Sequence, residues 1–150
     1  MIDFRPIFLI LGFLLTTLAI MMLVPAAVDI FSGNSDWQVF GAAAAVTLFI
    51  GVSLSLTSRM GGAKLSIRQA FILTTLSWIV LTVFAALPFT FSQLEMSFTD
   101  AFFEAMSGIT TTGATVIVNL DDAPPGLLLW RALLQWLGGI GIIVMALAVL

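Results

Sequence analysis

The feature that most constrains the fold is an almost uninterrupted apolar run over residues 7–28. A helix needs about 20 consecutive, mostly apolar residues to cross the hydrocarbon core of a bilayer, so this run is long enough to span one. Similar runs follow at 39–56, at 70–91 and from residue 127 onward. Charged residues make up only 9% of the chain, against roughly 25% in a typical soluble domain. We therefore expect an all-α membrane protein.

The first run has a second interpretation, as a cleavable signal peptide. Arg5 precedes the run, and Pro25, Ala26 and Ala27 supply small residues near its end. The apolar core of a signal peptide is typically about 7–15 residues long, which is shorter than this run. The length favours a retained helix, and both interpretations leave the orientation of the later spans unchanged.

The distribution of charge predicts how the spans are oriented. The loop at 59–69 holds three of the five basic residues and no acid, and short basic loops of this kind face the cytoplasm. The connections on the other side carry the acids. Asp29 and Asp36 mark the first of them, and the segment between the third and fourth runs has five acids and no Lys or Arg. We expect a cytoplasmic N-terminus and an acidic outer face.

That outer segment contains a short helix of its own, predicted at about 98–107. Ser97 and Asp100 have the spacing of a capping box, and Gly108 is a natural stop, because glycine accepts the left-handed conformation that ends helices. Roughly ten residues give a helix of about 15 Å, half the thickness of the bilayer core. Such a helix can enter the membrane but cannot cross it.

The chain therefore divides into three parts along its length. Residues 1–58 hold two leading transmembrane helices, and the cytoplasmic basic loop occupies 59–69. Residues 70–150 form one unit of helix, re-entrant pore loop and helix. Its predicted elements are an outer helix at 70–91, a pore helix at about 98–107, a filter loop at 108–116 and an inner helix from 127.

Three consecutive threonines lie near Gly113 in the predicted loop. Rings of backbone carbonyls can replace the water shell of a dehydrating K⁺. Aiming successive carbonyls the same way needs backbone conformations that glycine reaches at low steric cost, and threonine adds a hydroxyl. A threonine-rich turn in an exposed loop is the alternative. The position of the stretch, after a half-length helix and between two full spans, favours a cation filter.

Composition excludes several other functions. The chain has no Cys and no His, which rules out disulfides, thiolate chemistry, imidazole bases and the commonest zinc sites. We expect no enzymatic activity, no cofactor and no nucleic-acid partner. A solute-coupled secondary transporter with a broken-helix site at the Thr-Gly loop is an alternative, but it requires paired broken segments in inverted halves, which this sequence lacks. A structural or assembly subunit without a pathway of its own is a third interpretation.

Two stretches resemble a known family. Residues 103–115, FEAMSGITTTGAT, and 129–142, LWRALLQWLGGIGI, are similar to the filter loop and the following helix in the Trk/Ktr/HKT superfamily of potassium transporters, above all in its TrkH-type branch. The resemblance covers nearly the whole chain, because that branch also places two extra helices before its first pore unit. It implies uptake of K⁺, as the transported ion, across the bacterial inner membrane, with the filter mouth outside.

The resemblance also implies roles for single residues. Four such units surround one potassium-channel-like pore in the family, and each lends one filter strand. Channel filters have Tyr-Gly after the first glycine, where this chain has Ala-Thr, and the difference predicts weaker bracing. The implied carbonyl ligands of K⁺ are those of Thr111, Thr112, Gly113 and Ala114, with Thr110 and Thr115 as flanking supports.

The family further implies partners beyond the lipid bilayer. These are a second copy, forming a homodimer, and a cytoplasmic nucleotide-binding regulatory subunit of the TrkA type. Only one Thr-Thr-Gly segment occurs, and the sequence ends inside an apolar run. We therefore expect the N-terminal portion of a longer protein rather than one of four identical chains. Whether uptake is passive or coupled to H⁺ or Na⁺ stays open.

Two charged residues lie close to the predicted filter. Glu104 is a candidate for bracing the loop through backbone N–H groups, and a solvated or ion-paired carboxylate is the alternative. Arg131 is expected to form a structural pair with Glu104 or with one of the acids at 121–122.

Glycines and tryptophans predict packing rather than chemistry. Gly138, Gly139 and Gly141 lie near the middle of the inner helix, where close helix packing is expected and a hinge is the alternative. Trp37 and Trp130 are expected in the aromatic belt at the outer interface.

Overall fold

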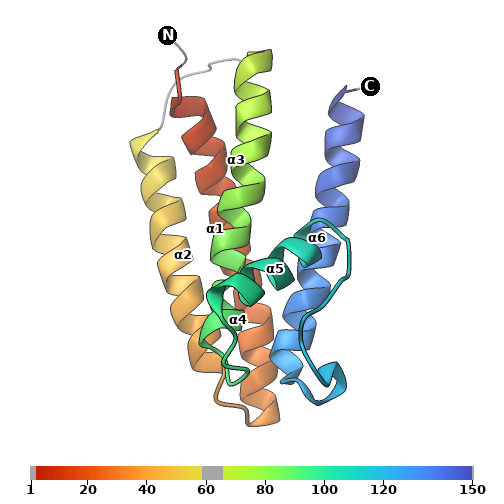
Figure 1. The fold of residues 1–150 in the computed structure, drawn as a ribbon. Helices are drawn as coiled ribbons and strands as arrows, with labels where there is room; N and C mark the ends of the chain where they lie inside the picture. The colour runs from red at the N-terminus through yellow and green to blue at the C-terminus, as the bar shows by residue number, and fades with distance from the viewer. Residues whose placement is uncertain (1–2, 59–65, 150) are drawn as a thin grey trace.

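The computed structural model describes residues 3–58 and 66–149, with side chains through residue 141. Within these ranges the chain forms helices and turns and no β-strand. In chain order the elements are α1 (Arg5–Ser32), α2 (Trp37–Thr57), α3 (Ile67–Ala85), α4 (Leu87–Phe91), α5 (Phe98–Ile109), the short 3₁₀ helix η1 (Leu120–Asp122) and α6 (Pro125–Val149). Figure 1 shows that the N-terminus, the start of α3 and the end of α6 lie at one end of the bundle.

The long helices match the lengths that a bilayer demands. Three helices of the described part are long and apolar enough to cross a membrane: α1, α2, and α3 continued by α4. The fourth predicted span corresponds to α6, which has 25 residues. At the standard rise this helix is about 37 Å long, more than the roughly 30 Å of a bilayer core. The predicted all-α membrane fold is confirmed.

The leading helices α1 and α2 form an antiparallel hairpin (Figure 1). A Cβ added to Gly12 on α1 would lie 2.6 Å from the carbonyl oxygen of Gly51 on α2, so the two backbones touch because both residues are glycine. Helix α1 runs to Ser32, beyond the predicted end at residue 28, and Gly33 ends it with a φ of 70°. The prediction that Asp29 lies in a loop is therefore wrong, because Asp29 belongs to the last turn of α1.

Helix α3 begins at a capping box that the sequence analysis overlooked. The Ser66 hydroxyl accepts the backbone N–H of Gln69 at 3.3 Å, and the Gln69 side chain accepts that of Ser66 at 2.8 Å. Helix α3 thus starts before residue 70, and Arg68 of the predicted basic loop is helical. The rest of that loop, at 59–65, lies outside the described residues. Helix α3 ends just before Pro88, whose nitrogen cannot donate to the preceding turn.

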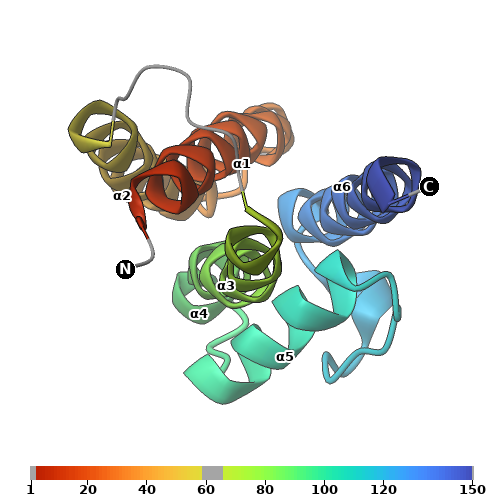
Figure 2. The same cartoon turned by 90° about the horizontal axis from the view of Figure 1, so that it is seen from above.

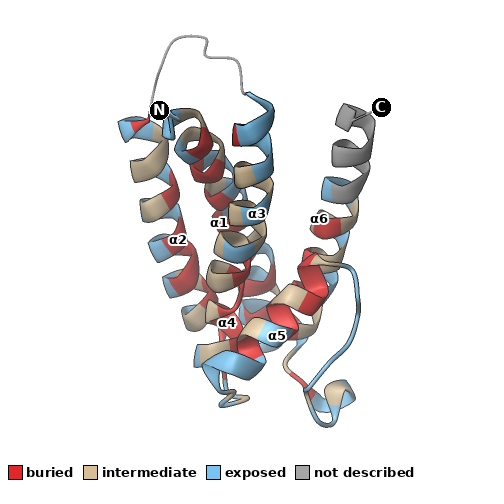
Figure 3. Cartoon of the chain, turned by 45° about the horizontal axis from the view of Figure 1, so that its top comes forward, coloured by how far each residue is buried: buried red, intermediate tan, exposed pale blue. Residues whose placement is uncertain are grey.

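The core lies where the short helix α5 crosses the bundle. Figure 2 shows α5 passing beside α3, α4 and α6, and Figure 3 shows buried residues gathered around that crossing. Trp130 on α6 is fully buried there; its Nε1 donates to the carbonyl of Ala85 at 3.0 Å, and its ring packs edge-on against Phe40. The prediction that Trp130 lies in the aromatic belt at the outer interface is wrong, because its ring is buried and its N–H donates to an internal carbonyl. Trp37 is 42% exposed.

Candidate ion filter

Helix α5 aims its C-terminus at the threonine-rich stretch. It begins at Ser97, whose hydroxyl accepts the backbone N–H of Asp100 at 3.1 Å. It continues through the predicted stop at Gly108 and ends at Ile109. Gly108 serves packing instead, because a Cβ there would lie 3.0 Å from the Cβ of Leu134 on α6. Residues 108 and 109 of the predicted filter loop at 108–116 are therefore helical. The segment that follows α5, residues 110–116, is called the filter loop from here on.

The filter loop has an unusual backbone. Thr111 and Gly113 both have positive φ angles, 59° and 76°. Glycine adopts this conformation at low cost, but a β-branched residue such as threonine does so only when its surroundings impose it. Backbone strain of this kind persists only where the surrounding structure maintains it, and it is found most often at functional sites.

The N–H groups of the filter loop turn back toward α5. Those of Thr112 and Gly113 both donate to the carbonyl of Ser107, at 2.9 and 3.3 Å, and that of Thr111 donates to the carbonyl of Gly108 at 2.9 Å. These bonds satisfy carbonyls at the end of α5 that have no partner inside the helix. They also fix which side of the loop its N–H groups occupy.

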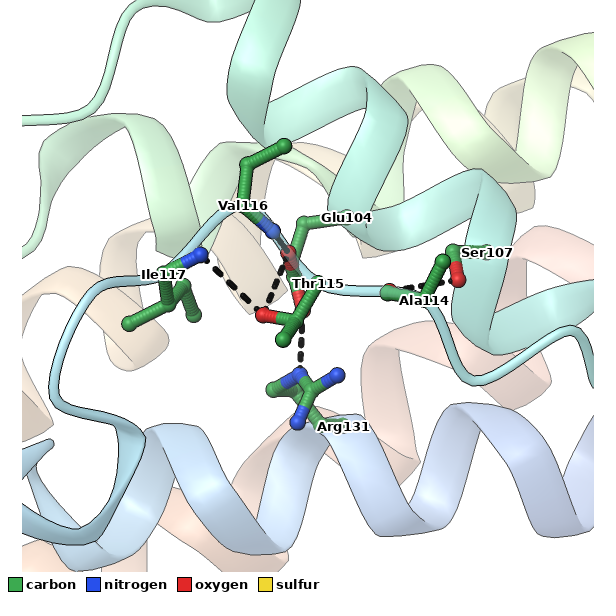
Figure 4. Close-up of polar contacts among 7 residues, drawn as sticks. All are labelled: Glu104, Ser107, Ala114, Thr115, Val116, Ile117 and Arg131. Atoms are coloured by element: carbon green, nitrogen blue, oxygen red, sulfur yellow. Dashed lines mark hydrogen bonds and ion pairs between the residues drawn. The ribbon is translucent and has the colours of Figure 1, made fainter.

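The carbonyls of the same residues have no hydrogen-bond donor among the described residues. Within the described part of the chain, those of Thr111, Thr112 and Gly113 accept no hydrogen bond. The carbonyl of Ala114 differs, because it accepts the Ser107 hydroxyl at 2.7 Å. Figure 4 shows this bond reaching from α5 to the loop. The four carbonyls that the resemblance groups together are thus three free ones and one held by α5.

Glu104 and Arg131 join the filter loop to both helices of the unit. The Glu104 carboxylate is buried, and its Oε2 accepts the backbone N–H of Val116 at 3.0 Å and the hydroxyl of Thr115 at 3.1 Å. Its Oε1 forms an ion pair with Nε of Arg131 on α6 (Figure 4). Of the partners considered for Arg131, the structure selects Glu104, while the acids at 121–122 lie exposed in η1.

The remaining threonine hydroxyls bond within the loop and helix. The hydroxyl of Thr110 donates to the carbonyl of Met106 at 2.7 Å and lies 2.9 Å from that of Thr112. The hydroxyl of Thr115 also accepts the N–H of Ile117 at 3.1 Å. Thr110 and Thr115 thus lie toward the two ends of the loop, and their role as flanking supports stays a prediction.

Helix α6 lies directly behind the loop. A Cβ added to Gly138 would fall 1.8 Å from the carbonyl oxygen of Ile109, so the end of α5 rests on bare backbone. The other two glycines are different: among the described atoms the nearest to a Cβ on Gly139 would be 3.9 Å away, and none lies within 4 Å of one on Gly141. Among the described residues, a close contact is therefore found at Gly138. The side-chain nitrogen of Gln135 would lie 3.4 Å from a Cβ on Gly113.

Sequence reasoning missed Ser107, which supplies both a carbonyl and a hydroxyl to the loop. Its signal was a small polar residue in the last turn of a helix, just before the threonines. Sequence reasoning also missed the contact of Asp29 with Gly126, whose N–H donates to Asp29 Oδ1 at 2.8 Å. Its only signal was a charge at the end of an otherwise apolar span.

The fold and this site define a class: a multi-pass membrane protein with a short helix and a strained loop set between two long helices. The profile of the TrkH family, described as "Cation transport protein", matches residues 36–150. The chain belongs to that family, as its filter stretch suggested.

Individual relatives agree with the family assignment. The Trk system potassium uptake protein TrkI of Halomonas elongata is 42% identical over 145 residues, which cover 97% of this chain and 30% of that protein. TrkH of Escherichia coli is 41% identical, with coverage of 99% and 31%. The crystal structure of the potassium transporter TrkH from Vibrio parahaemolyticus matches with a TM-score of 0.93 at 41% identity, over 99% of this chain and 32% of that one. The chain thus spans about a third of the length of these relatives.

Proposed function

We propose that this chain contributes one strand of a carbonyl-lined filter through which K⁺ enters the cell. The observation that carries the proposal is the sidedness of the filter loop. Its N–H groups at Thr112 and Gly113 are bound to α5, whereas the carbonyls of Thr111, Thr112 and Gly113 have no hydrogen bond within the described residues. Carbonyls that a fixed backbone leaves without a hydrogen bond are suitable ligands for a dehydrated cation.

The helix behind the loop favours a cation. The C-terminal end of a helix carries a partial negative charge, equivalent to about half an elementary charge. Helix α5 ends at Ile109, directly before the filter loop, so this charge lies next to the free carbonyls. An anion at the same place would be repelled by both.

The hydrogen bond from Ser107 refines the set of ligands. A carbonyl held at 2.7 Å by a buried hydroxyl is directed toward that hydroxyl. We therefore assign direct coordination of K⁺ to the carbonyls of Thr111, Thr112 and Gly113. The proposed role of Ala114 is to fix the outer end of the strand through its bond to Ser107.

The relatives support the choice of ion, because the names of TrkI and TrkH state potassium uptake. The remaining parts of the proposal extend to the intact protein. It lies in the inner membrane with its N-terminus in the cytoplasm and the filter loop facing outside, and four filter strands surround one pore. It pairs with a second copy and with a TrkA-type nucleotide-binding subunit. The mechanism is dehydration, coordination and permeation, and no covalent step is required.

The test compares two glycines with similar backbones. Gly113→Ala and Gly33→Ala both place a Cβ at a positive φ, 76° and 70° respectively, but Gly33 ends α1 and a Cβ there would meet no atom within 4 Å. Rb⁺ uptake is measured in K⁺-starved cells that make the intact protein, with and without competing Na⁺. We expect Gly113→Ala to lower the Rb⁺ to Na⁺ preference by about tenfold, the equivalent of the αL strain on one residue. Gly33→Ala should keep the wild-type preference. Unchanged uptake and preference in Gly113→Ala would overturn the filter proposal.

A further inference from the structure

Asp29 occupies a place that its own helix disfavours. It lies in the last turn of α1, where the partial negative charge of the helix end repels a carboxylate. It is also fully buried, and burial of a charge is costly without a partner. An acid in this position needs a compensating interaction elsewhere in the fold.

That interaction comes from the first turn of α6. Pro125 opens the helix, and the first bond of its ladder runs from Leu128 N–H to the carbonyl of Pro124 at 3.1 Å. Pro124 has no side-chain oxygen with which to cap the helix, so the N–H of Gly126 has no local acceptor. Asp29 Oδ1 accepts it at 2.8 Å, across 97 positions of sequence. A carboxylate of α1 therefore does the work of the missing N-cap of α6.

Gly126 and the Asp29 carboxylate are in close contact. A Cβ added to Gly126 would lie 2.2 Å from Asp29 Oδ2, so the cap requires glycine at this position. Asp29 Oδ2 is buried and has no hydrogen-bond partner among the described residues. The carboxylate is therefore held by a hydrogen bond from α6 at Oδ1 and by packing at Oδ2.

A continuous set of contacts leads from this cap to the filter loop. Arg131 lies five residues after Gly126 on α6 and pairs with Glu104. Glu104 in turn holds the backbone N–H of Val116. We propose that Asp29 is a positioning residue for the filter: the leading hairpin sets the place of the inner helix, and the inner helix sets the brace of the loop. This inference rests on the proposed filter function.

The first test uses substitutions at Asp29 in the intact protein. Asp29→Ala removes the cap, and Asp29→Asn keeps an acceptor oxygen without the charge. We expect Asp29→Ala to lower the Rb⁺ to Na⁺ preference of uptake by about fivefold, the equivalent of one lost helix cap. Asp29→Asn should keep most of the wild-type preference. Asp122→Ala is the matched control, because it removes an exposed acid on the same side and should leave the preference unchanged. A preference that stays at the wild-type value in Asp29→Ala while only the amount of protein falls would overturn the proposal, and so would an equal loss in Asp122→Ala.

A double-mutant cycle keeps the inference testable if Asp29→Ala accumulates poorly. Gly126→Ala should lower the melting temperature in detergent when Asp29 is present, and should be nearly harmless in the Asp29→Ala background, where the obstructing carboxylate is gone. If the losses in melting temperature of Gly126→Ala and Asp29→Ala were additive in the double variant, the proposed capping of α6 by Asp29 would be overturned. The cycle does not depend on transport, so it separates the two proposals: a normal Gly113→Ala phenotype overturns the filter, and additivity overturns the cap.

Discussion

Arg131 on α6 forms an ion pair with Glu104 on α5, across 27 positions of sequence. The Glu104 side chain is 0% exposed and that of Arg131 is 14% exposed. The second carboxylate oxygen of Glu104 binds Thr115 and Val116. One carboxylate thus connects the short helix, the inner helix and the filter loop. The conformation of the loop therefore depends on the Arg131 guanidinium, which balances the charge of this carboxylate.

Removing the guanidinium should be severely destabilising. Arg131→Ala leaves the Glu104 carboxylate buried without its counter-charge, for which the expected loss in free energy of unfolding is about 3–5 kcal/mol. Chemical denaturation in detergent measures this loss, and Rb⁺ uptake should fall with it. In the double variant Arg131→Met with Glu104→Gln no charge is buried, so more than half of the lost stability should return. Equal stability of the single and double variants would show that the ion pair does not balance a buried charge.

The two adjacent glycines of α6 offer a matched pair. Gly138→Ala places a methyl group 1.8 Å from the carbonyl oxygen of Ile109, which must separate α5 from α6 at a cost of about 1–3 kcal/mol. Gly139→Ala meets nothing closer than 3.9 Å and gains helix propensity. We expect a lower melting temperature and weaker Rb⁺ uptake for Gly138→Ala alone. Equal effects of the two substitutions would indicate that flexibility, as at a hinge, matters more than the contact with Ile109.

Thr111 holds a left-handed backbone at a cost that substitution can reveal. Thr111→Gly relieves about 1–2 kcal/mol of αL strain. This gain is offset by about 0.5–1 kcal/mol, because glycine loses more conformational entropy on folding than threonine does. Stability should therefore stay level or rise slightly, while the looser loop should discriminate less between Rb⁺ and Na⁺.

Thr112→Gly is the control for this prediction, because Thr112 is not among the residues with positive φ. It carries the entropy cost of glycine without relief of strain, so it should be the less stable of the two variants in thermal melts. The reverse order of melting temperatures would contradict a strained Thr111.

The elements that sequence predicts well are those whose length is set by the bilayer. Helices α1, α2 and α6 appear as apolar runs because each must cross the hydrocarbon core, and α5 is recognisable because it is too short to do so. The ends of helices are harder to predict. In the sequence, an acid such as Asp29 after an apolar run indicates the start of a loop. The backbone N–H that stabilises it inside the helix belongs to a residue 97 positions away, so local sequence does not reveal it.

Single residues at the site show the same limit. Gly108 has the sequence signal of a helix stop, but in the structure it lies within α5 and makes room for Leu134. Local sequence cannot distinguish these uses of glycine, because both need only the absence of a Cβ. Trp130 likewise faces the core because a carbonyl of α3 accepts its N–H. That partner is visible only once the helices are packed.

Asp36, in the turn between α1 and α2, links stability to pH. Burial raises the pKa of its carboxyl above the ordinary 3.8, while the N–H of Gln93, which donates to it at 3.3 Å, opposes the shift. The folded state therefore holds this proton more tightly than the unfolded state does. The stability that the proton contributes is complete below pH 3.8 and is lost as the pH rises through the folded-state pKa.

Asp36→Asn keeps an acceptor oxygen for Gln93 and carries no charge at any pH. At neutral pH we expect it to melt at a higher temperature than the wild type, because it avoids a buried charge. The difference should shrink toward zero as the pH falls below 3.8, where the wild-type carboxyl is neutral too. Melting in detergent over this range measures it, with the exposed Asp122→Asn as the control for surface charge. A difference that grows at low pH would mean that the Asp36 carboxylate stabilises the fold in its charged form.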